Sequence, residues 1–196
     1  MKRDHNELNH RIKNNLQLVV SILNIQAKES RSNEVKSELE LGQKRVVSIM
    51  LMHESIDFHY KENIVDMDMY IYKIYSYLKE AYDVKDEDSF LQLNANNIKL
   101  KMDLALPLGL IINEFLLSSL LNSKISNLNV SILLEYDEIR ANYLLSFSDD
   151  SIYENLERKE DNLGIEMVKI LLKQIKAKIT AQSTYNTFYQ IEFPKE

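Results

Sequence analysis

Apolar residues recur with helical spacing through the first sixty residues. Between residues 3 and 29 they follow one another by three or four positions, which places on one helix face Leu8, Ile12, Leu16, Val19, Leu23 and Ala27. A polar stretch at residues 29–33 predicts a short turn, and a second apolar stripe predicts another helix over residues 34–60. Such an antiparallel hairpin cannot cover its own apolar surface, so we expect a dimeric four-helix bundle made by two copies.

The pattern changes after residue 66. Helical periodicity predicts helices over residues 66–83, 104–122 and 162–177. Alternating apolar and polar positions predict strands at residues 90–93, 98–101, 130–135, 143–147, 179–183 and 188–193. This order predicts an α/β sandwich with one largely antiparallel sheet. The expected fold is therefore α + α/β, with a helical hairpin at residues 1–62 and an α/β domain at residues 66–196.

Composition and charge exclude several classes of function. The chain has no cysteine, which excludes disulfides, thiolate zinc sites and cysteine nucleophiles. Residues 1–60 carry a net charge of +1 and residues 61–196 carry −7, and so acidic a body argues against a nucleic-acid partner. No apolar run reaches the roughly 18 residues of a membrane helix, and the N-terminus lacks a signal-peptide pattern. We therefore expect a cytoplasmic protein with no membrane span.

His10 is the first residue with candidate chemistry. It lies about 200° around the helix from the apolar residue two positions before it, so we expect it to face solvent. Arg11 and Lys13 follow it, Glu7 is spaced to bond one ring nitrogen, and Asn14 comes one turn later. An exposed imidazole with these neighbours suits a nucleophile that accepts a phosphoryl group. Spacing alone, however, favours an ordinary surface histidine.

Residues 7–17 read E-L-N-H-R-I-K-N-N-L-Q. They resemble the phospho-acceptor helix of one class of bacterial sensor histidine kinases, whose signature is E-L-x-H-R-x-K-N-x-L-Q. The resemblance continues at residues 45–49 and 53–54, which match R-[VI]-x-S-[IL] and H-E. It continues again at residues 106–114, which resemble the opening of the N box of the family's ATP-binding domain. The resemblance thus covers nearly the whole chain.

The resemblance implies a separate function for each of the two domains. The hairpin would dimerise and present His10, and the α/β domain would bind ATP and magnesium and phosphorylate it. The phosphoryl group would then pass to an aspartate in the receiver domain of a response regulator. Asn14 matches the position where related families use Asn or Thr to orient a water molecule in phosphatase chemistry. His53, on the apolar stripe of the second helix, is expected to be a packed, hydrogen-bonded residue and not a second acceptor.

The nucleotide-binding boxes depart from the family pattern. In the N box, Ser118 replaces the asparagine that holds magnesium and Leu121 replaces the basic residue that faces the phosphates. The D-N-G-x-G box keeps Asp149 but has lost both glycines and places Tyr153 near the pocket. The usual Gly-Thr near the last strand reads Asn-Thr at residues 186–187. We therefore expect a degenerate nucleotide pocket formed by Asn113, Glu114, Ser118, Asp149 and Gly164.

These departures favour a protein that resembles a phosphorelay histidine phosphotransferase. It would carry a phosphoryl group on His10 between receiver aspartates and need neither cofactor nor metal of its own. The first alternative is an active histidine kinase, or a catalytic fragment of one, which would use ATP and magnesium. The second alternative is a non-catalytic scaffold that binds a receiver domain or a kinase.

Overall fold

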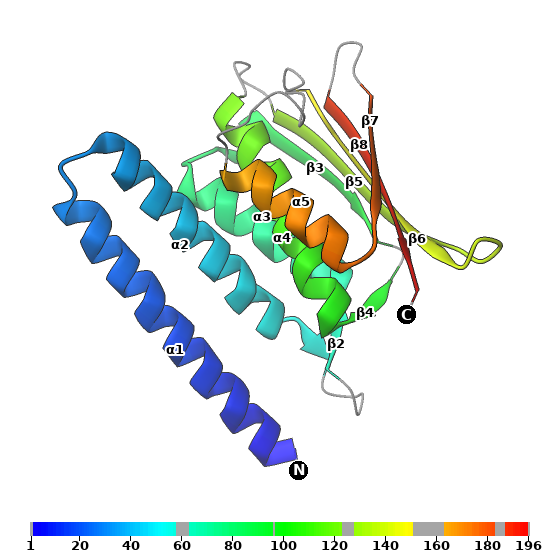
Figure 1. The fold of residues 1–196 in the computed structure, drawn as a ribbon, viewed down its shortest axis with the longest axis horizontal. Helices are drawn as coiled ribbons and strands as arrows, with labels where there is room; N and C mark the ends of the chain where they lie inside the picture. Colours follow the sequence, from blue (N-terminus) through cyan, green and yellow to red (C-terminus); the bar gives the residue numbers. More distant parts are fainter. Residues whose placement is uncertain are drawn as a thin grey trace.

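A computed structural model describes the backbone of most of the chain (Figure 1). The described residues are 2–57, 63–95, 97–122, 128–150, 163–182 and 187–195, and their side chains are described except at residues 2–10, 122, 128, 182 and 187.

The N-terminal hairpin consists of two antiparallel helices, as predicted. α1 spans Lys2–Glu29 and α2 spans Asn33–His53. Ser32 begins α2, because its hydroxyl accepts a hydrogen bond of 3.4 Å from the backbone N–H of Val35. α1 lies on the outer side of α2, and α2 packs against the helices of the α/β domain (Figure 1).

The prediction that the second helix continues to residue 60 is wrong. α2 ends at His53, where the Ser55 hydroxyl donates to the Leu51 carbonyl over 2.8 Å. The chain then enters the short strand β1 (Ile56–Asp57), which pairs with β2 (Ile64–Asp66). This pairing buries β-branched Ile56, which favours an extended backbone over a further helical turn.

Two sheets follow the hairpin. The small one has the order β1-β2-β4, with β4 at Lys99–Lys101. The large one has the order β3-β5-β6-β8-β7, and all its neighbours are antiparallel except β3 and β5. Its strands are β3 (Ser89–Asn94), β5 (Leu128–Asp137), β6 (Asn142–Asp149), β7 (Lys178–Gln182) and β8 (Thr187–Pro194). The prediction of a largely antiparallel sheet is therefore confirmed.

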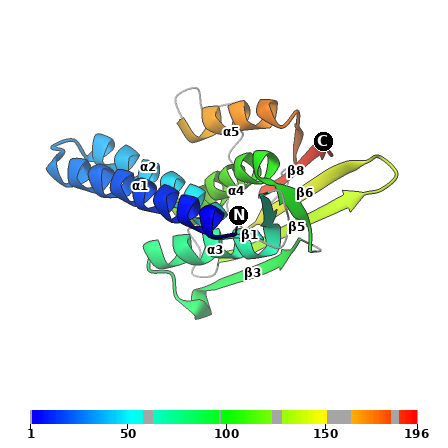
Figure 2. The same cartoon turned by 90° about the horizontal axis from the view of Figure 1, so that it is seen from below.

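The helices α3 (Met67–Ala81), α4 (Met102–Asn122) and α5 (Leu163–Gln174) cover one face of the large sheet, and a short 3-10 helix, η1 (Asp86–Asp88), precedes β3 (Figures 1 and 2). This arrangement is the predicted α/β sandwich. By length and composition alone α4 could cross a membrane, but 72% of its apolar window is buried inside the fold. α4 is therefore the central core helix of this domain.

The hydrophobic core does not stop at the α/β domain. Met52 at the end of α2 and Ile56 in β1 belong to the same buried cluster as α3, α4 and the large sheet. The end of the hairpin is thus built into the core of the domain that follows it. Movement of the hairpin relative to that domain would expose these side chains to water.

Candidate functional site

The part of α1 that carries His10 lies beside the C-terminal end of α2. His10 and Glu7 are in the helical part of α1, and their side chains lie outside the described residues. Three residues after the histidine, Lys13 forms an ion pair with the carboxylate of Glu54, which directly follows α2. Arg11 and Asn14 both have exposed side chains. The predicted cationic neighbours of His10 are therefore on the surface, and one of them is engaged across the hairpin.

A buried ion pair joins the hairpin to the predicted nucleotide segment. Arg45 of α2 binds both carboxylate oxygens of Glu114 of α4, with Nε–Oε1 at 3.0 Å and Nη2–Oε2 at 2.8 Å. The two side chains are only 12% and 9% exposed. Burial alone would lower the pKa of Arg45, but the hydrogen bond and the charge of Glu114, together with the charge of Glu38, outweigh it and raise the pKa. The contact is therefore a charged, bidentate pair.

A second contact lies one turn further along α2. The Ser48 hydroxyl is 3.3 Å from the phenolic oxygen of Tyr70 in α3, and both side chains are fully buried. The Tyr70 ring passes so close to Gly109 of α4 that a Cβ atom there would lie 2.1 Å from it. Burial raises the pKa of Tyr70, an effect that the bond to Ser48 partly offsets. Arg45 and Ser48, three residues apart, thus share the α2 face that contacts the α/β domain.

The predicted nucleotide residues divide into two separate groups. Asn113 is fully buried, and its Nδ2 donates to Oε1 of Glu114 over 3.2 Å, while its Oδ1 has no hydrogen-bond partner in the described part of the chain. Asp149 is buried at the end of β6, where it is hydrogen-bonded to the hydroxyl of Ser119. The Glu114 carboxylate thus faces α2, while the Asp149 carboxylate bonds to α4 from the sheet.

The remaining predicted positions of this site differ in burial, and some lie outside the described residues. Ser118 is half-buried, Gly164 is buried in the first turn of α5, and Leu121 is 58% exposed. Tyr153 and Asn186 lie outside the described residues, as does the side chain of Thr187.

Aromatic rings occupy the space between α4 and the sheet near Asp149. Phe115 of α4 stacks on Tyr189 of β8 with ring centroids 4.4 Å apart, and its centroid is 5.2 Å from that of Phe147 in β6. All three are at most 5% exposed. Phe115 stands where the family's N box has leucine, so this side of α4 is packed by side chains of the protein itself.

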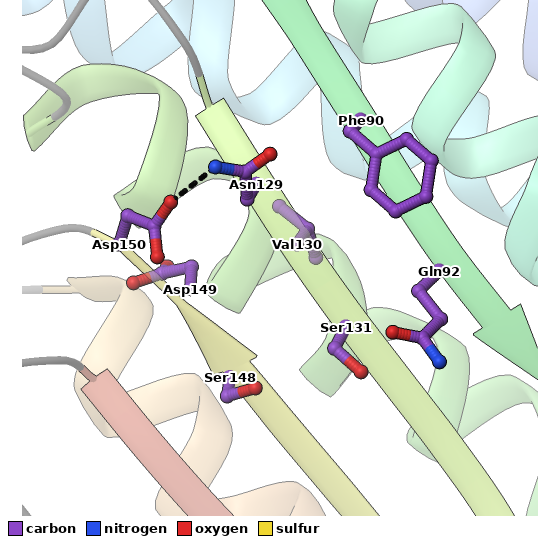
Figure 3. A pocket seen from close by; sticks show the side chains of 8 residues that line it. All are labelled: Phe90, Gln92, Asn129, Val130, Ser131, Ser148, Asp149 and Asp150. Atoms are coloured by element: carbon purple, nitrogen blue, oxygen red, sulfur yellow. Dashed lines mark hydrogen bonds between the residues drawn. The ribbon is translucent and has the colours of Figure 1, made fainter.

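A hollow of about 230 Å³ opens at one end of the large sheet (Figure 3). It includes Asp149 but none of the other predicted nucleotide residues. Most of its side chains alternate along their strands with core residues, so they lie on the sheet face that the helices leave open. Its lining residues are Phe90, Gln92, Asn129, Val130, Ser131, Ser148, Asp149 and Asp150.

Comparisons with known proteins show which family this chain is similar to. A family model described as histidine kinase matches residues 7–82. The sensor histidine kinase PdtaS of Mycolicibacterium smegmatis is 28% identical over 173 residues, which are 85% of this chain and 34% of that protein. PdtaS of Mycobacterium tuberculosis is 34% identical over 88 residues, 45% of this chain and 17% of that protein. Residues 7–82 thus match the histidine kinase family, and the chain as a whole is similar to two-component sensor histidine kinases.

The fold agrees with this assignment. The histidine kinase domain of the Erythrobacter litoralis blue-light activated histidine kinase superposes with a TM-score of 0.67 at 21% identity, covering 98% of this chain and 91% of that domain. The chain spans at most about a third of the length of the two PdtaS proteins. Members of the histidine kinase family typically dimerise and signal to response regulators.

His53 matches its prediction in part. The side chain is half-buried at the end of α2, and this burial lowers its pKa. The predicted hydrogen bond is missing at Nδ1, which has no partner among the described residues. This partial burial agrees with the expectation of a packed side chain.

Sequence reasoning missed the partners of the histidine kinase motifs. Glu54 contacts both Lys73 of α3 and Lys13 of α1, and neither Glu54 nor Lys73 carries a signal beyond the H-E pair at residues 53–54. Ser119, whose hydroxyl donates a hydrogen bond to Asp149, carries no such signal in the sequence. Arg45 and Ser48 did carry a signal in the sequence. Their spacing places two polar side chains on one face of a helix that packs on both sides.

Proposed function

We propose that this histidine kinase family member carries a phosphoryl group on His10 and exchanges it with receiver-domain aspartates, without taking it from ATP. A ring nitrogen of His10 attacks the phosphorus of an aspartyl phosphate. The N–P bond forms while the P–O bond to the aspartate breaks, and the carboxylate leaves with the electron pair. The other ring nitrogen keeps its proton, for which Glu7 is spaced as an acceptor. Transfer to a second receiver reverses these steps.

The state of Glu114 is the observation that carries this proposal. Both of its oxygens bind Arg45 of the hairpin. On the same helix, Ser118 and Leu121 stand where the family pattern has the metal-binding asparagine and the basic residue. ATP binding would require this helix to offer ligands for magnesium and for the phosphates. We infer that the α/β domain has kept the fold and lost the nucleotide.

A homodimer is part of this proposal. α1 exposes a row of large apolar side chains on a face turned away from α2: Leu18 is 61% exposed, Ile22 46% and Ile25 57%. Their spacing by four and three residues makes one continuous stripe that a second hairpin can cover. We place the exchange in the cytoplasm, where a free receiver domain can reach the exposed acceptor helix.

An active kinase is the second candidate. Asp149 and Gly164 are retained, both are buried, and the relative that aligns with 85% of the chain is named as a sensor histidine kinase. In that case ATP and magnesium would occupy the α/β domain, and His10 would be labelled without a receiver.

The proposal is tested with a panel of receiver domains, each loaded with radiolabelled acetyl phosphate and then freed of the small donor. At least one receiver should pass label to the full chain, and His10→Gln should abolish the transfer. His53→Gln is the matched control and should keep the label. A receiver that binds the chain without labelling it would support the scaffold alternative, and label that persists in His10→Gln would refute the assignment of the acceptor.

A further inference from the structure

Two lysines from different domains meet at one carboxylate near the acceptor. Glu54, directly after α2, pairs with Lys13 of α1. Lys73 of α3 donates from Nζ to the backbone carbonyl of Glu54 over 2.8 Å, and the same Nζ lies 3.9 Å from its carboxylate Oε2. The cluster therefore connects both helices of the hairpin with the first helix of the α/β domain.

Lys73 is well placed to fix Glu54. Its side chain is 29% exposed, and that of Glu54 is 33% exposed. Burial lowers the pKa of Lys73, the nearby Glu54 charge opposes this, and the Lys13 charge adds to it. A backbone carbonyl cannot change rotamer, so the hydrogen bond to it ties Lys73 to the end of α2. Glu54 then has one cation on each side.

Lys13 is the member closest to the chemistry. It follows His10 by three residues, which is about 4.5 Å of helix rise, and residues at this spacing are neighbours on a helix surface. A fixed cation beside the acceptor favours the approach of an anionic phosphoryl group. A lysine free to sample all its rotamers would offer this charge only part of the time.

We propose that Lys73 and Glu54 are positioning residues for phosphotransfer, which hold Lys13 beside His10, so that the α/β domain contributes to the reaction without binding nucleotide. This inference rests on the proposed function, because it assigns the cluster a role in the phosphorylation of His10. It gives the retained α/β domain a contribution that does not depend on ATP.

The test uses phosphoramidate as a receiver-free phosphoryl donor, with loading of His10 in the full chain followed by mass spectrometry. Lys73→Met should slow the loading by about three- to tenfold, as expected for a partly buried ion pair. Lys73→Arg keeps the charge and should restore the rate to within about twofold of the original. The matched control is Lys79→Met on the same helix, which removes an ion pair with Asp86 and should leave the rate unchanged.

A double-mutant cycle separates positioning from a general structural effect. If Lys73 acts through Lys13, then Lys73→Met should have no further effect in a Lys13→Met background. Equal loading in Lys73→Met and the original chain, or an undiminished effect in the Lys13→Met background, would overturn the inference while leaving the proposed function intact. Failure of every receiver to label an original chain that phosphoramidate does load would instead refute the proposed function.

Discussion

The hairpin and α4 each contain motifs of the histidine kinase pattern, but they match that pattern to different degrees. In the hairpin, Lys13 and Arg45 match the family pattern and both make ion pairs. In α4, Ser118 and Leu121 depart from the pattern, and the retained Glu114 contacts the hairpin. The hairpin thus keeps the residues of the family pattern, whereas α4 has replaced two of them and its retained Glu114 bonds to the hairpin.

On the proposed function, this difference means that a nucleotide-binding fold can persist after its ligand residues are lost. The α/β domain is held together by the buried face of α4, the sheet and the stacked rings of Phe115 and Tyr189, none of which requires a bound phosphate. The same domain covers one side of α2 through Ser48 and Met52. The α/β domain therefore supports the hairpin through contacts that involve no nucleotide.

The largest expected effect on folding comes from the ion pair that joins the two regions. Arg45→Met leaves the Glu114 carboxylate buried without its cation and should lower the free energy of unfolding by about 3–5 kcal/mol. The double variant Arg45→Met with Glu114→Met should recover most of this loss, because no unpaired charge remains. Urea denaturation measures all of these values.

The matched control for this pair is exposed. Lys169 and Glu166 of α5 form an ion pair of 2.9 Å with about half of each side chain in water. Lys169→Met should change the stability by less than about 1 kcal/mol. An Arg45→Met variant as stable as this control would show that the hairpin and the α/β domain are not joined as described.

The next effect concerns the outer face of the hairpin. Ile22→Asp places a charge in the apolar stripe of α1 and should weaken the dimer by at least about a hundredfold. Asn24→Asp adds the same charge at an exposed polar position of the same helix and should leave the dimer intact. Light scattering over a concentration series distinguishes the two. Equal dissociation of both variants, or an original chain that is monomeric at micromolar concentration, would contradict the proposed bundle.

Two glycines give opposite predictions for the same substitution in the two regions. Gly109→Ala forces a methyl group into the Tyr70 ring and should destabilise the α/β domain by about 1–3 kcal/mol. Gly42→Ala lies in α2 with its nearest neighbouring atom, Leu23 Cδ1, 4.0 Å away, and should stabilise the chain by about 0.5–1 kcal/mol. Thermal unfolding measures whether each substitution lowers or raises the stability. Stabilisation by Gly109→Ala would contradict the packing of Tyr70.

The smallest effect is a pH dependence at His53. Burial lowers the pKa of the folded side chain, so the unfolded chain binds a proton here at a higher pH than the folded chain does. Stability should therefore fall as the pH drops through the ordinary histidine range. Comparison of denaturation at about pH 7.5 and about pH 5.5 should show a smaller fall in His53→Gln than in the original chain. An equal or larger fall in the variant would show that His53 contributes nothing to the pH dependence.

Periodicity in the sequence was sufficient for most of the fold. The apolar spacing predicted α1 within a residue or two, and the strands of the large sheet followed from alternation. The end of α2 could not be predicted in this way, because residues 54–60 show no helix-breaking glycine or proline. The helix ends there because Ile56 pairs with Val65, a contact that local propensity does not encode.

The candidate site was predictable only where a motif names the residue. His10 follows from eleven consecutive residues, and the replacements at Ser118 and Leu121 follow from comparison with the family pattern. The pairing of Glu114 with Arg45 could not be predicted from the sequence. The two residues are 69 positions apart, and nothing in either segment indicates that they meet. Contacts between domains depend on how their surfaces fit, which spacing along the chain does not report.

The central claim is that His10 receives its phosphoryl group from a receiver and not from ATP. The most direct measurement compares the initial rate of His10 phosphorylation in the full chain from MgATP with the rate from a labelled receiver, at equal protein concentration. The account predicts label from the receiver and none from MgATP above that of the His10→Gln chain. Label on His10 from MgATP at a rate equal to or above the receiver rate would contradict it and establish an active kinase.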